Sequence, residues 1–187
     1  MKAVSILLVR HCEASGQAPE APLTAVGAEA AVALSDRLRA LGVDSLYSSP
    51  FRRALETVSP YAEKHALTVA IDYRLAERRL AASPVDDWLE QVRLSFDDLD
   101  HRAPGGESLG EAQTRGLAAL ADIAAAGRRL PAVATHGNLL SAILRSIDVR
   151  FGFAAWQQLK NPDLFMLTCD DGRPVAFERL PSSVPSG

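Results

Sequence analysis

The chain contains only two cysteines, Cys12 and Cys169, among its 187 residues. Two thiols exclude a disulfide framework and a zinc site built from four cysteines. Lysine and arginine number 20 against 23 aspartates and glutamates, so the formal net charge is −3 and the basic footprint of a nucleic-acid binding protein is missing. No apolar run approaches the roughly 20 residues that cross a bilayer. We therefore expect neither nucleic acid nor a membrane as a partner.

The amino terminus shows no secretory signal. The apolar run that follows Lys2 breaks at Arg10, and no small-residue cleavage site comes after it. This pattern favours a soluble, cytoplasmic protein. The chain has no internal repeat, and its length is typical of one domain with a sizeable core. We expect a single domain over residues 1–180 and a flexible tail over residues 181–187, which are rich in proline and serine.

Two short apolar runs are each followed by a histidine. Residues 6–9 lead into Arg10 and His11, and residues 130–135 lead into His136 and Gly137. Apolar runs of this length indicate buried strands, which are typical of parallel sheets. In such sheets the ligand lies beyond the carboxyl ends of the strands. The sequence therefore predicts one site built by two distant segments.

The order of the remaining elements predicts an α/β fold with a parallel core. Further strands are expected over residues 43–48 and 67–71, and a hairpin joins residues 164–168 to 175–179. Helices are expected over residues 25–41, from residue 50 onward with a kink or interruption near Ser59 caused by Pro60, and over 84–95, 108–126, 139–147 and 151–159. The expected caps are Thr24, Ser49 before Pro50, Ser83, and Ser108 with Glu111 in a capping box; Gly42 and Gly127 are expected stops.

Three motifs follow one another along the chain: Arg10-His11-x-Glu13, Ser48-Ser49-Pro50 leading to Arg53-Ala54, and Thr135-His136-Gly137. In this order they resemble the histidine phosphatase superfamily, also called the phosphoglycerate mutase-like family. An Arg-His pair alone would be weak support, but the ordered set spans most of the chain. The resemblance implies a three-layer α/β/α fold with a mostly parallel mixed sheet. It also implies phosphoryl chemistry on a small phosphorylated substrate, with no metal and no cofactor.

A phosphoryl site needs positive charge, a nucleophile and a proton for the leaving oxygen. Arg10 and Arg53 carry planar forks of donors that match phosphate oxygens. His136 adds a donor, and a helix that begins near Gly137 would present N–H groups to an anion. His11 is the candidate nucleophile, because a neutral imidazole is available near pH 7 and nearby arginines favour the neutral ring. The resemblance implies a phosphohistidine at this residue and a catalytic role for the second histidine.

The resemblance also supplies a proton donor. Leu75-Ala76-Glu77 resembles the family's Leu-x-Glu segment, so Glu77 is predicted to protonate the leaving oxygen and then to act as a base toward water. Glu107, which lies at a helix entry, is the second candidate, and we favour a structural role for it. Gln17 stands six residues after His11, where phosphoglycerate mutases place an asparagine that contacts phosphate. We therefore add Gln17 to the predicted phosphate ligands.

Other interpretations of these residues are weaker. A cysteine phosphatase would need an arginine where Ala18 stands, so Cys12 is expected to be a small filler whose thiol the phosphate site could make reactive. A metal site built from His11, Glu13 and His136 lacks the helical His-x-x-x-His spacing. Three arginines are expected to be surface or rim charges: Arg78, Arg79 and Arg115.

A phosphatase is the favoured function. The alternatives are a phosphoglycerate mutase and a non-catalytic protein that binds phosphorylated ligands. Mutases of the classical kind have a longer chain after the proton donor, and non-catalytic relatives typically lose one of the phosphate ligands. The sequence leaves the substrate and the oligomeric state open.

Overall fold

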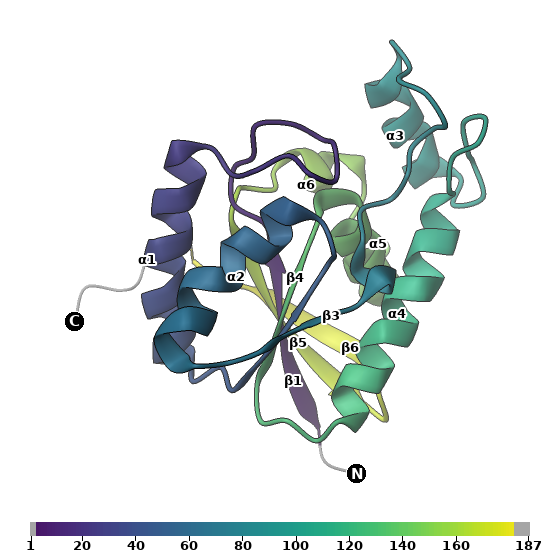
Figure 1. Cartoon of the computed structure of the whole chain (residues 1–187). Helices are drawn as coiled ribbons and strands as arrows, with labels where there is room; N and C mark the ends of the chain where they lie inside the picture. The colour runs from purple at the N-terminus through teal and green to yellow at the C-terminus, as the bar shows by residue number, and fades with distance from the viewer. Residues whose placement is uncertain (1–2, 182–187) are drawn as a thin grey trace.

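The computed structural model describes residues 3–181, and within them six strands form one mixed sheet in the order β3-β2-β4-β1-β5-β6 (Figure 1). The strands are β1 (Val4–Arg10), β2 (Ser45–Ser48), β3 (Val69–Ile71), β4 (Pro131–Thr135), β5 (Asp163–Asp170) and β6 (Arg173–Arg179). The first four strands run parallel, whereas β5 and β6 are antiparallel to their neighbours. Apart from Pro181, the predicted flexible tail lies outside the described residues.

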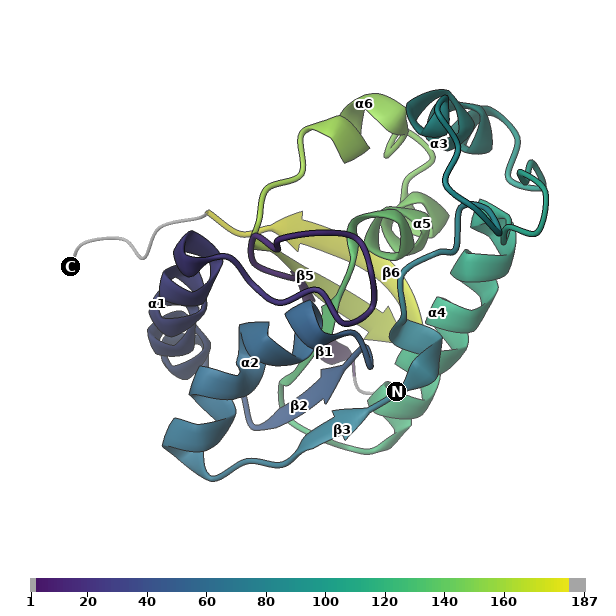
Figure 2. The same cartoon turned by 45° about the horizontal axis from the view of Figure 1, so that its top comes forward.

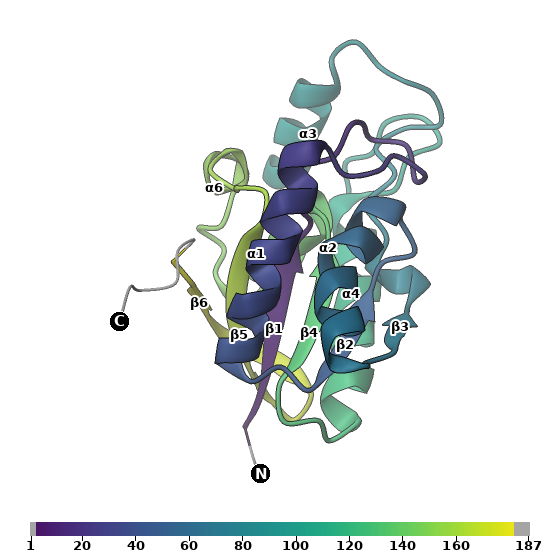
Figure 3. The same ribbon diagram turned by 60° about the vertical axis from the view of Figure 1, so that its left-hand side comes forward.

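Helices cover both faces of this sheet (Figures 1 and 3). They are α1 (Ala25–Leu41), α2 (Arg52–His65), α3 (Trp88–Asp97), α4 (Leu109–Ala125), α5 (Gly137–Ile147) and α6 (Phe153–Gln157), with a 3₁₀ turn η1 (Tyr73–Leu75). Side chains alternate between the two faces of β1. Ile6 and Leu8 pack with α4 and α5 on one face, and Leu7 and Val9 pack with α1 and α2 on the other. The predicted three-layer α/β/α fold with a mostly parallel mixed sheet is confirmed.

The strand register places the carboxyl ends of three parallel strands side by side, at what is called here the carboxyl edge of the sheet. Arg10 of β1 pairs with Thr135 of β4, and Ser48 of β2 pairs with Ala134 of β4. Backbone hydrogen bonds continue past the strand ends, since the N–H of His11 donates to the Thr135 carbonyl at 3.0 Å. The segments that follow β1, β2 and β4 therefore lie side by side, as the two apolar runs predicted.

Several helix ends match their local sequence signals. The Thr24 side chain accepts a hydrogen bond from the Gly27 N–H, and Gly42 ends α1 with φ of 78°. Both bonds of the capping box between Ser108 and Glu111 are present at the start of α4. The predicted hairpin is also confirmed, because Asp171 and Gly172, with φ of 49° and 75°, turn the chain between β5 and β6.

The predicted start of α2 was wrong, and the helix is not interrupted at Pro60. The helix begins at Arg52 instead of Pro50, and the Ser49 hydroxyl accepts a hydrogen bond from the Phe51 N–H outside the helix. The helix continues through Pro60 to His65, so of the two predicted effects of this proline the interruption is excluded. Val58 and Tyr61 are buried on either side of this proline. Packing against the sheet therefore outweighs the lost helical hydrogen bond.

Several other helices and strands are shorter than predicted. Helix α3 begins at Trp88 instead of residue 84, and Ser83 does not cap it. Its core face consists of Val92, Ser95 and Phe96, whereas residues 83–87 bury no side chain that could hold a helix to the body. Strands β2 and β3 and helix α6 are likewise shorter than expected. Within residues 3–181, no helix combines the length and apolar character needed to span a bilayer.

Candidate active site

The two predicted histidines meet at the carboxyl edge of the sheet. The centroids of the His11 and His136 rings are 5.1 Å apart, and the rings are arranged edge to face. His11 is 8% exposed and His136 is fully buried. In Figure 2 the loop between β1 and α1 crosses over this edge, above the ends of the parallel strands. Two segments that are 125 residues apart in the chain thus form one site.

Hydrogen bonds fix the tautomer of His11. Its Nδ1 lies 2.6 Å from the Cys12 carbonyl oxygen, which can only accept, so Nδ1 carries the proton. Its Nε2 accepts a hydrogen bond from Arg53 Nε at 3.2 Å. Burial, and then the charges of Arg53 and Arg10, lower the pKa of His11 to about 4 against the opposing effect of the Cys12 bond. The ring is therefore neutral near pH 7, with a lone pair on Nε2.

This pKa makes folding depend on pH. An unfolded histidine titrates near 6.5, so between about pH 4 and 6.5 the unfolded chain binds a proton that folded His11 does not. The free energy of unfolding therefore falls as the pH is lowered through this window, by about 3 kcal/mol from His11 alone. Urea unfolding between pH 4 and 7 should show a smaller decrease for His11→Asn than for the wild type. A ring titration followed by NMR should have its midpoint near pH 4, and a midpoint near 6.5 would contradict the assignment.

His136 is held by Ser49. Its Nε2 lies 2.7 Å from the Ser49 hydroxyl, which already accepts the Phe51 N–H. When this hydroxyl donates to Nε2, the imidazole carries its proton on Nδ1, and Nδ1 is buried with no partner within residues 3–181. Burial, followed by the charge of His11, lowers the pKa of His136 well below its usual value. The second imidazole can thus offer a neutral N–H donor beside the first.

Arg53 connects the nucleophile candidate to the loop above it. This arginine is 1% exposed. Besides the bond to His11, its Nη1 donates to the carbonyl oxygens of Gln17 and Ala18 at 3.1 and 2.9 Å. Gln17 itself is exposed. The structure ties Gln17 to the site through its main chain, and the predicted contact of its amide with phosphate stays a prediction.

Arg10 lies against the start of α5. Its Nη1 donates to the carbonyl oxygens of Leu159 and Lys160 at 3.0 and 3.3 Å, and its Nε is buried with no partner within residues 3–181. A Cβ atom at position 137 would lie 3.3 Å from both Nε and Nη2 of Arg10. Gly137 therefore lets the guanidinium approach the helix closely.

Two further residues brace the peptide that follows His11. Asn161 donates from Nδ2 to the His11 carbonyl oxygen at 2.8 Å. The Thr57 hydroxyl accepts the Cys12 N–H at 2.9 Å and donates to the Arg53 carbonyl oxygen at 2.7 Å. We did not predict Asn161, because no local pattern signals a contact across 150 residues. The placement of Thr57 on the same face of α2 as Arg53 was a usable signal.

Glu77 occupies the amino end of α5. Its two carboxylate oxygens accept the backbone N–H groups of Asn138 and Leu139, both at 3.1 Å. Two of the N–H groups that we expected to face phosphate are thus bound by Glu77. Burial lowers the pKa of Arg10 and of Arg53, and in each case the charge of Glu77 opposes the decrease. The carboxylate therefore lies within electrostatic reach of both arginines.

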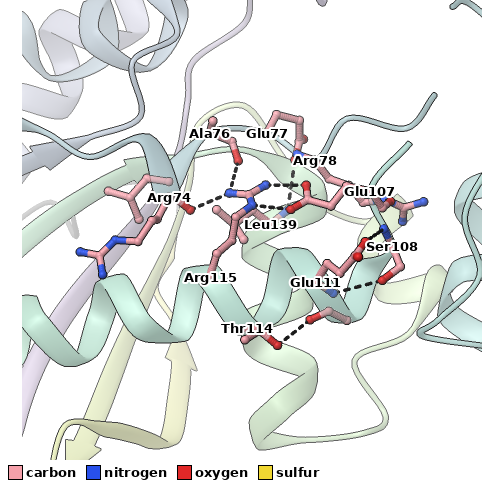
Figure 4. Close-up of polar contacts among 12 residues, drawn as sticks. Arg74, Ala76, Glu77, Arg78, Glu107, Ser108, Glu111, Thr114, Arg115 and Leu139 are labelled. Atoms are coloured by element: carbon pink, nitrogen blue, oxygen red, sulfur yellow. Dashed lines mark hydrogen bonds and ion pairs between the residues drawn. The ribbon is translucent and has the colours of Figure 1, made fainter. Parts of the chain in front are cut away.

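Glu107 is engaged elsewhere. Its carboxylate accepts two hydrogen bonds from Arg115, at 2.6 and 2.9 Å (Figure 4). The expectation that Arg78 is a surface or rim charge was wrong, since Arg78 is 4% exposed; the Arg115 side chain is partly buried, at 22% exposed. This pairing supports the structural role that we favoured for Glu107.

Cys12 is fully buried, and burial raises the pKa of its thiol to about 11 despite the hydrogen bond with Thr57. Cys12 is thus a buried filler, as expected, and the raised pKa does not support an activated thiol. Within residues 3–181, no group of three or more histidine, cysteine, aspartate or glutamate side chains is arranged to hold a metal ion.

Two imidazoles and two guanidinium groups thus converge at the carboxyl edge of a mixed sheet, and this fold and site define an enzyme that handles phosphoryl groups. The chain belongs to the histidine phosphatase superfamily (branch 1), whose sequence profile matches residues 6–179. The family predicted from the ordered motifs is confirmed.

Known relatives include both phosphatases and mutases by name. A Salmonella typhi protein named probable phosphoglycerate mutase GpmB is 30% identical over 172 residues, which cover 83% of this chain and 78% of that protein. A mycobacterial glucosyl-3-phosphoglycerate phosphatase matches with a TM-score of 0.76 at 22% identity, over 95% of this chain and 97% of that one. A phosphoglycerate mutase from Bacillus anthracis str. Sterne matches with a TM-score of 0.73 at 18% identity, over 95% and 92%. At such identities the structural matches establish the fold.

Proposed function

We propose that the protein is a metal-independent phosphatase that hydrolyses small phosphate monoesters through a phosphohistidine on Nε2 of His11. The observation that carries this proposal is the state of the His11 ring. Its proton is held on Nδ1 by the Cys12 carbonyl, and its Nε2 lone pair faces the buried Arg53 guanidinium. A neutral nitrogen beside a fixed cation is suited to attack a dianionic phosphoryl group.

The first half-reaction transfers the phosphoryl group to the enzyme. A phosphate oxygen takes over the Arg53 N–H as the Nε2 lone pair attacks phosphorus. The bond between phosphorus and the ester oxygen breaks, and the leaving oxygen takes a proton from the carboxyl group of Glu77. Arg10, Arg53 and the Nδ1–H of His136 stabilise the charge on the phosphoryl oxygens.

The second half-reaction releases phosphate. The Glu77 carboxylate removes a proton from a water molecule, whose oxygen attacks phosphorus while the bond to Nε2 breaks. His11 regains its lone pair, and Glu77 regains its proton. The position of Glu77 supports its role in both half-reactions, because backbone N–H groups at the start of α5 hold its carboxylate near both arginines. Glu107 is a poorer candidate for these proton transfers, because the charged guanidinium of Arg115 engages both of its oxygens, whereas the donors to the Glu77 carboxylate are backbone N–H groups.

A phosphoglycerate mutase is the second candidate, because the curated relatives carry that name. The two functions differ in what happens to the phosphoenzyme. A mutase returns the phosphoryl group to the organic acceptor, whereas a phosphatase passes it to water. The stretch between Glu77 and α4 holds one short helix, α3, whereas classical mutases carry a longer chain there, which favours hydrolysis.

Incubation with 3-phosphoglycerate should separate the two functions. We expect inorganic phosphate as the product if this ester is accepted, and no accumulation of 2-phosphoglycerate, because the proposed intermediate reacts with water. Conversion to 2-phosphoglycerate without free phosphate would instead establish the mutase. A panel of phosphate esters should include sugar and glycerate phosphates, α-ribazole phosphate and a phosphoprotein. Turnover of the best substrate should be unchanged by a chelator.

A further inference from the structure

All three guanidinium nitrogens of Arg115 donate hydrogen bonds. Their acceptors lie in two segments close to Glu77: the side chain of Glu107 and the main chain just before Glu77. Its Nε and Nη2 donate to the Glu107 carboxylate at 2.6 and 2.9 Å. Its Nη1 donates to the carbonyl oxygens of Arg74 and Ala76 at 2.6 and 2.8 Å. Figure 4 shows this side chain rising from α4 between the two segments. The peptide immediately before Glu77 is therefore fixed by Arg115.

The residue after Glu77 is attached to the same partner. Arg78 donates from Nε to the Glu107 carbonyl oxygen at 3.0 Å, and its N–H donates to the Glu77 carboxylate at 2.8 Å. Glu107 thus reaches both sides of Glu77: its side chain acts through Arg115, and its main chain acts through Arg78. Meanwhile the Glu77 carboxylate itself lies on the start of α5.

We propose that the ion pair between Arg115 and Glu107 positions the Glu77 carboxyl for proton transfer to the leaving oxygen. Arg115 is then a positioning residue that acts through Glu77 and does not contact substrate. The inference rests on the proposed function, and it deepens the role of Glu77. A planar fork with two carboxylate bonds and two carbonyl bonds sets an orientation that a flexible lysine cannot. Displacing a reacting group by about 1 Å can lower a rate about 10²-fold, so such bracing affects catalysis.

A purely structural role predicts a different result. If Arg115 only tied α4 to Glu107 and to the main chain of residues 74–76, its removal would lower the amount of active enzyme equally for every substrate. A positioning role instead affects the substrates that need a proton on the leaving group. Two esters therefore discriminate between the roles: an alkyl phosphate, whose alkoxide needs protonation, and 2,4-dinitrophenyl phosphate, whose leaving group departs readily as an anion.

For Arg115→Met we expect kcat/KM to fall about tenfold or more with the alkyl ester, a part of the 10²–10⁴-fold that a general acid contributes. The decrease with 2,4-dinitrophenyl phosphate should be under about threefold, since little general acid catalysis is needed there. Glu77→Gln should show the same contrast more strongly. Equal decreases with both esters for Arg115→Met would overturn the proposal.

A double-mutant cycle tests whether Arg115 acts through Glu77. In the Glu77→Gln background, Arg115→Met should change kcat/KM with the alkyl ester by less than about twofold, because the group it positions is gone. Additive losses would overturn the inference, as would a Glu77→Gln variant with wild-type activity on both esters. Failure of the proposed function is distinct, because it would appear as full activity of a His11→Ala variant.

Further variants separate a loss of positioning from a loss of folded protein. Arg115→Lys keeps the charge without the fork, and Glu107→Gln weakens the pair from its other side; both should reproduce the contrast between esters in milder form. They carry the test if Arg115→Met does not fold. Arg150→Met is the control, because Arg150 pairs with Asp148 in the same bidentate way but is 87% exposed. Its kinetics should equal the wild type, and thermal unfolding of every variant reports its folding.

Discussion

Replacing His11 by alanine should abolish turnover, with kcat lowered by at least about 10⁴-fold. The variant removes the single lone pair that faces Arg53, and neither neighbour can replace it. His136 is fully buried with Nε2 bound to Ser49, and the thiol of Cys12 has a pKa of about 11. Any remaining activity would come from charge stabilisation by the two arginines, without a covalent step.

The measurement combines steady-state rates with a quenched reaction on a ³²P-labelled ester. The wild type should carry label that survives alkali and is lost in acid, as expected of a phosphoramidate bond, and His11→Ala should carry none. His65→Ala is a suitable control, because this histidine packs on Tyr61 near the end of α2, away from Arg53. Equal activity of His11→Ala and wild type would reject the nucleophile. Binding of inorganic phosphate by a wild type that hydrolyses no ester would instead favour the non-catalytic alternative.

The parts of the fold that could be predicted depend on local signals. Apolar runs identified β1 and β4, and the residues just beyond them identified the edge where the site lies. Thr24 and Ser108 marked helix starts because a capping side chain bonds within its own turn. Parallel pairing then made it necessary that His11 and His136 lie close together, although 125 residues separate them in the chain.

What the sequence could not predict depends on contacts between distant segments. Pro60 lies within α2 because Val58 and Tyr61 are buried on the sheet, a gain that no scan of the helix itself can show. Arg115 was expected to be a surface or rim charge, and its ion pair was not predicted, since Glu107 and the carbonyl of Ala76 lie outside α4. The same holds for Asn161 and its bond to the main chain of His11.

The second large effect is expected at Arg53. Arg53→Met should lower kcat/KM by about 10³-fold, in the range seen when an arginine that stabilises a phosphoryl transition state is lost. Two functions disappear together. The Nε–H that orients the lone pair of His11 is removed, and the loop above the site loses the donor to the carbonyl oxygens of Gln17 and Ala18. Arg53→Lys should not rescue the activity, because an ammonium cannot make these bonds in two directions at once.

The adjacent arginine provides a matched control. Arg52 is also an arginine and lies in the same helix, but its side chain is 57% exposed and pairs with Glu56. Because exposed ion pairs contribute little, Arg52→Met should leave kcat/KM within about twofold of the wild type. Thermal unfolding of both variants separates loss of activity from loss of fold. The acid limb of kcat/KM for Arg53→Met should also move to higher pH, because the Arg53 charge is one of the causes that lower the pKa of His11. If Arg53→Met and Arg52→Met have equal kcat/KM, the buried guanidinium does not act on phosphate, and the convergence of charges around His11 serves only the fold.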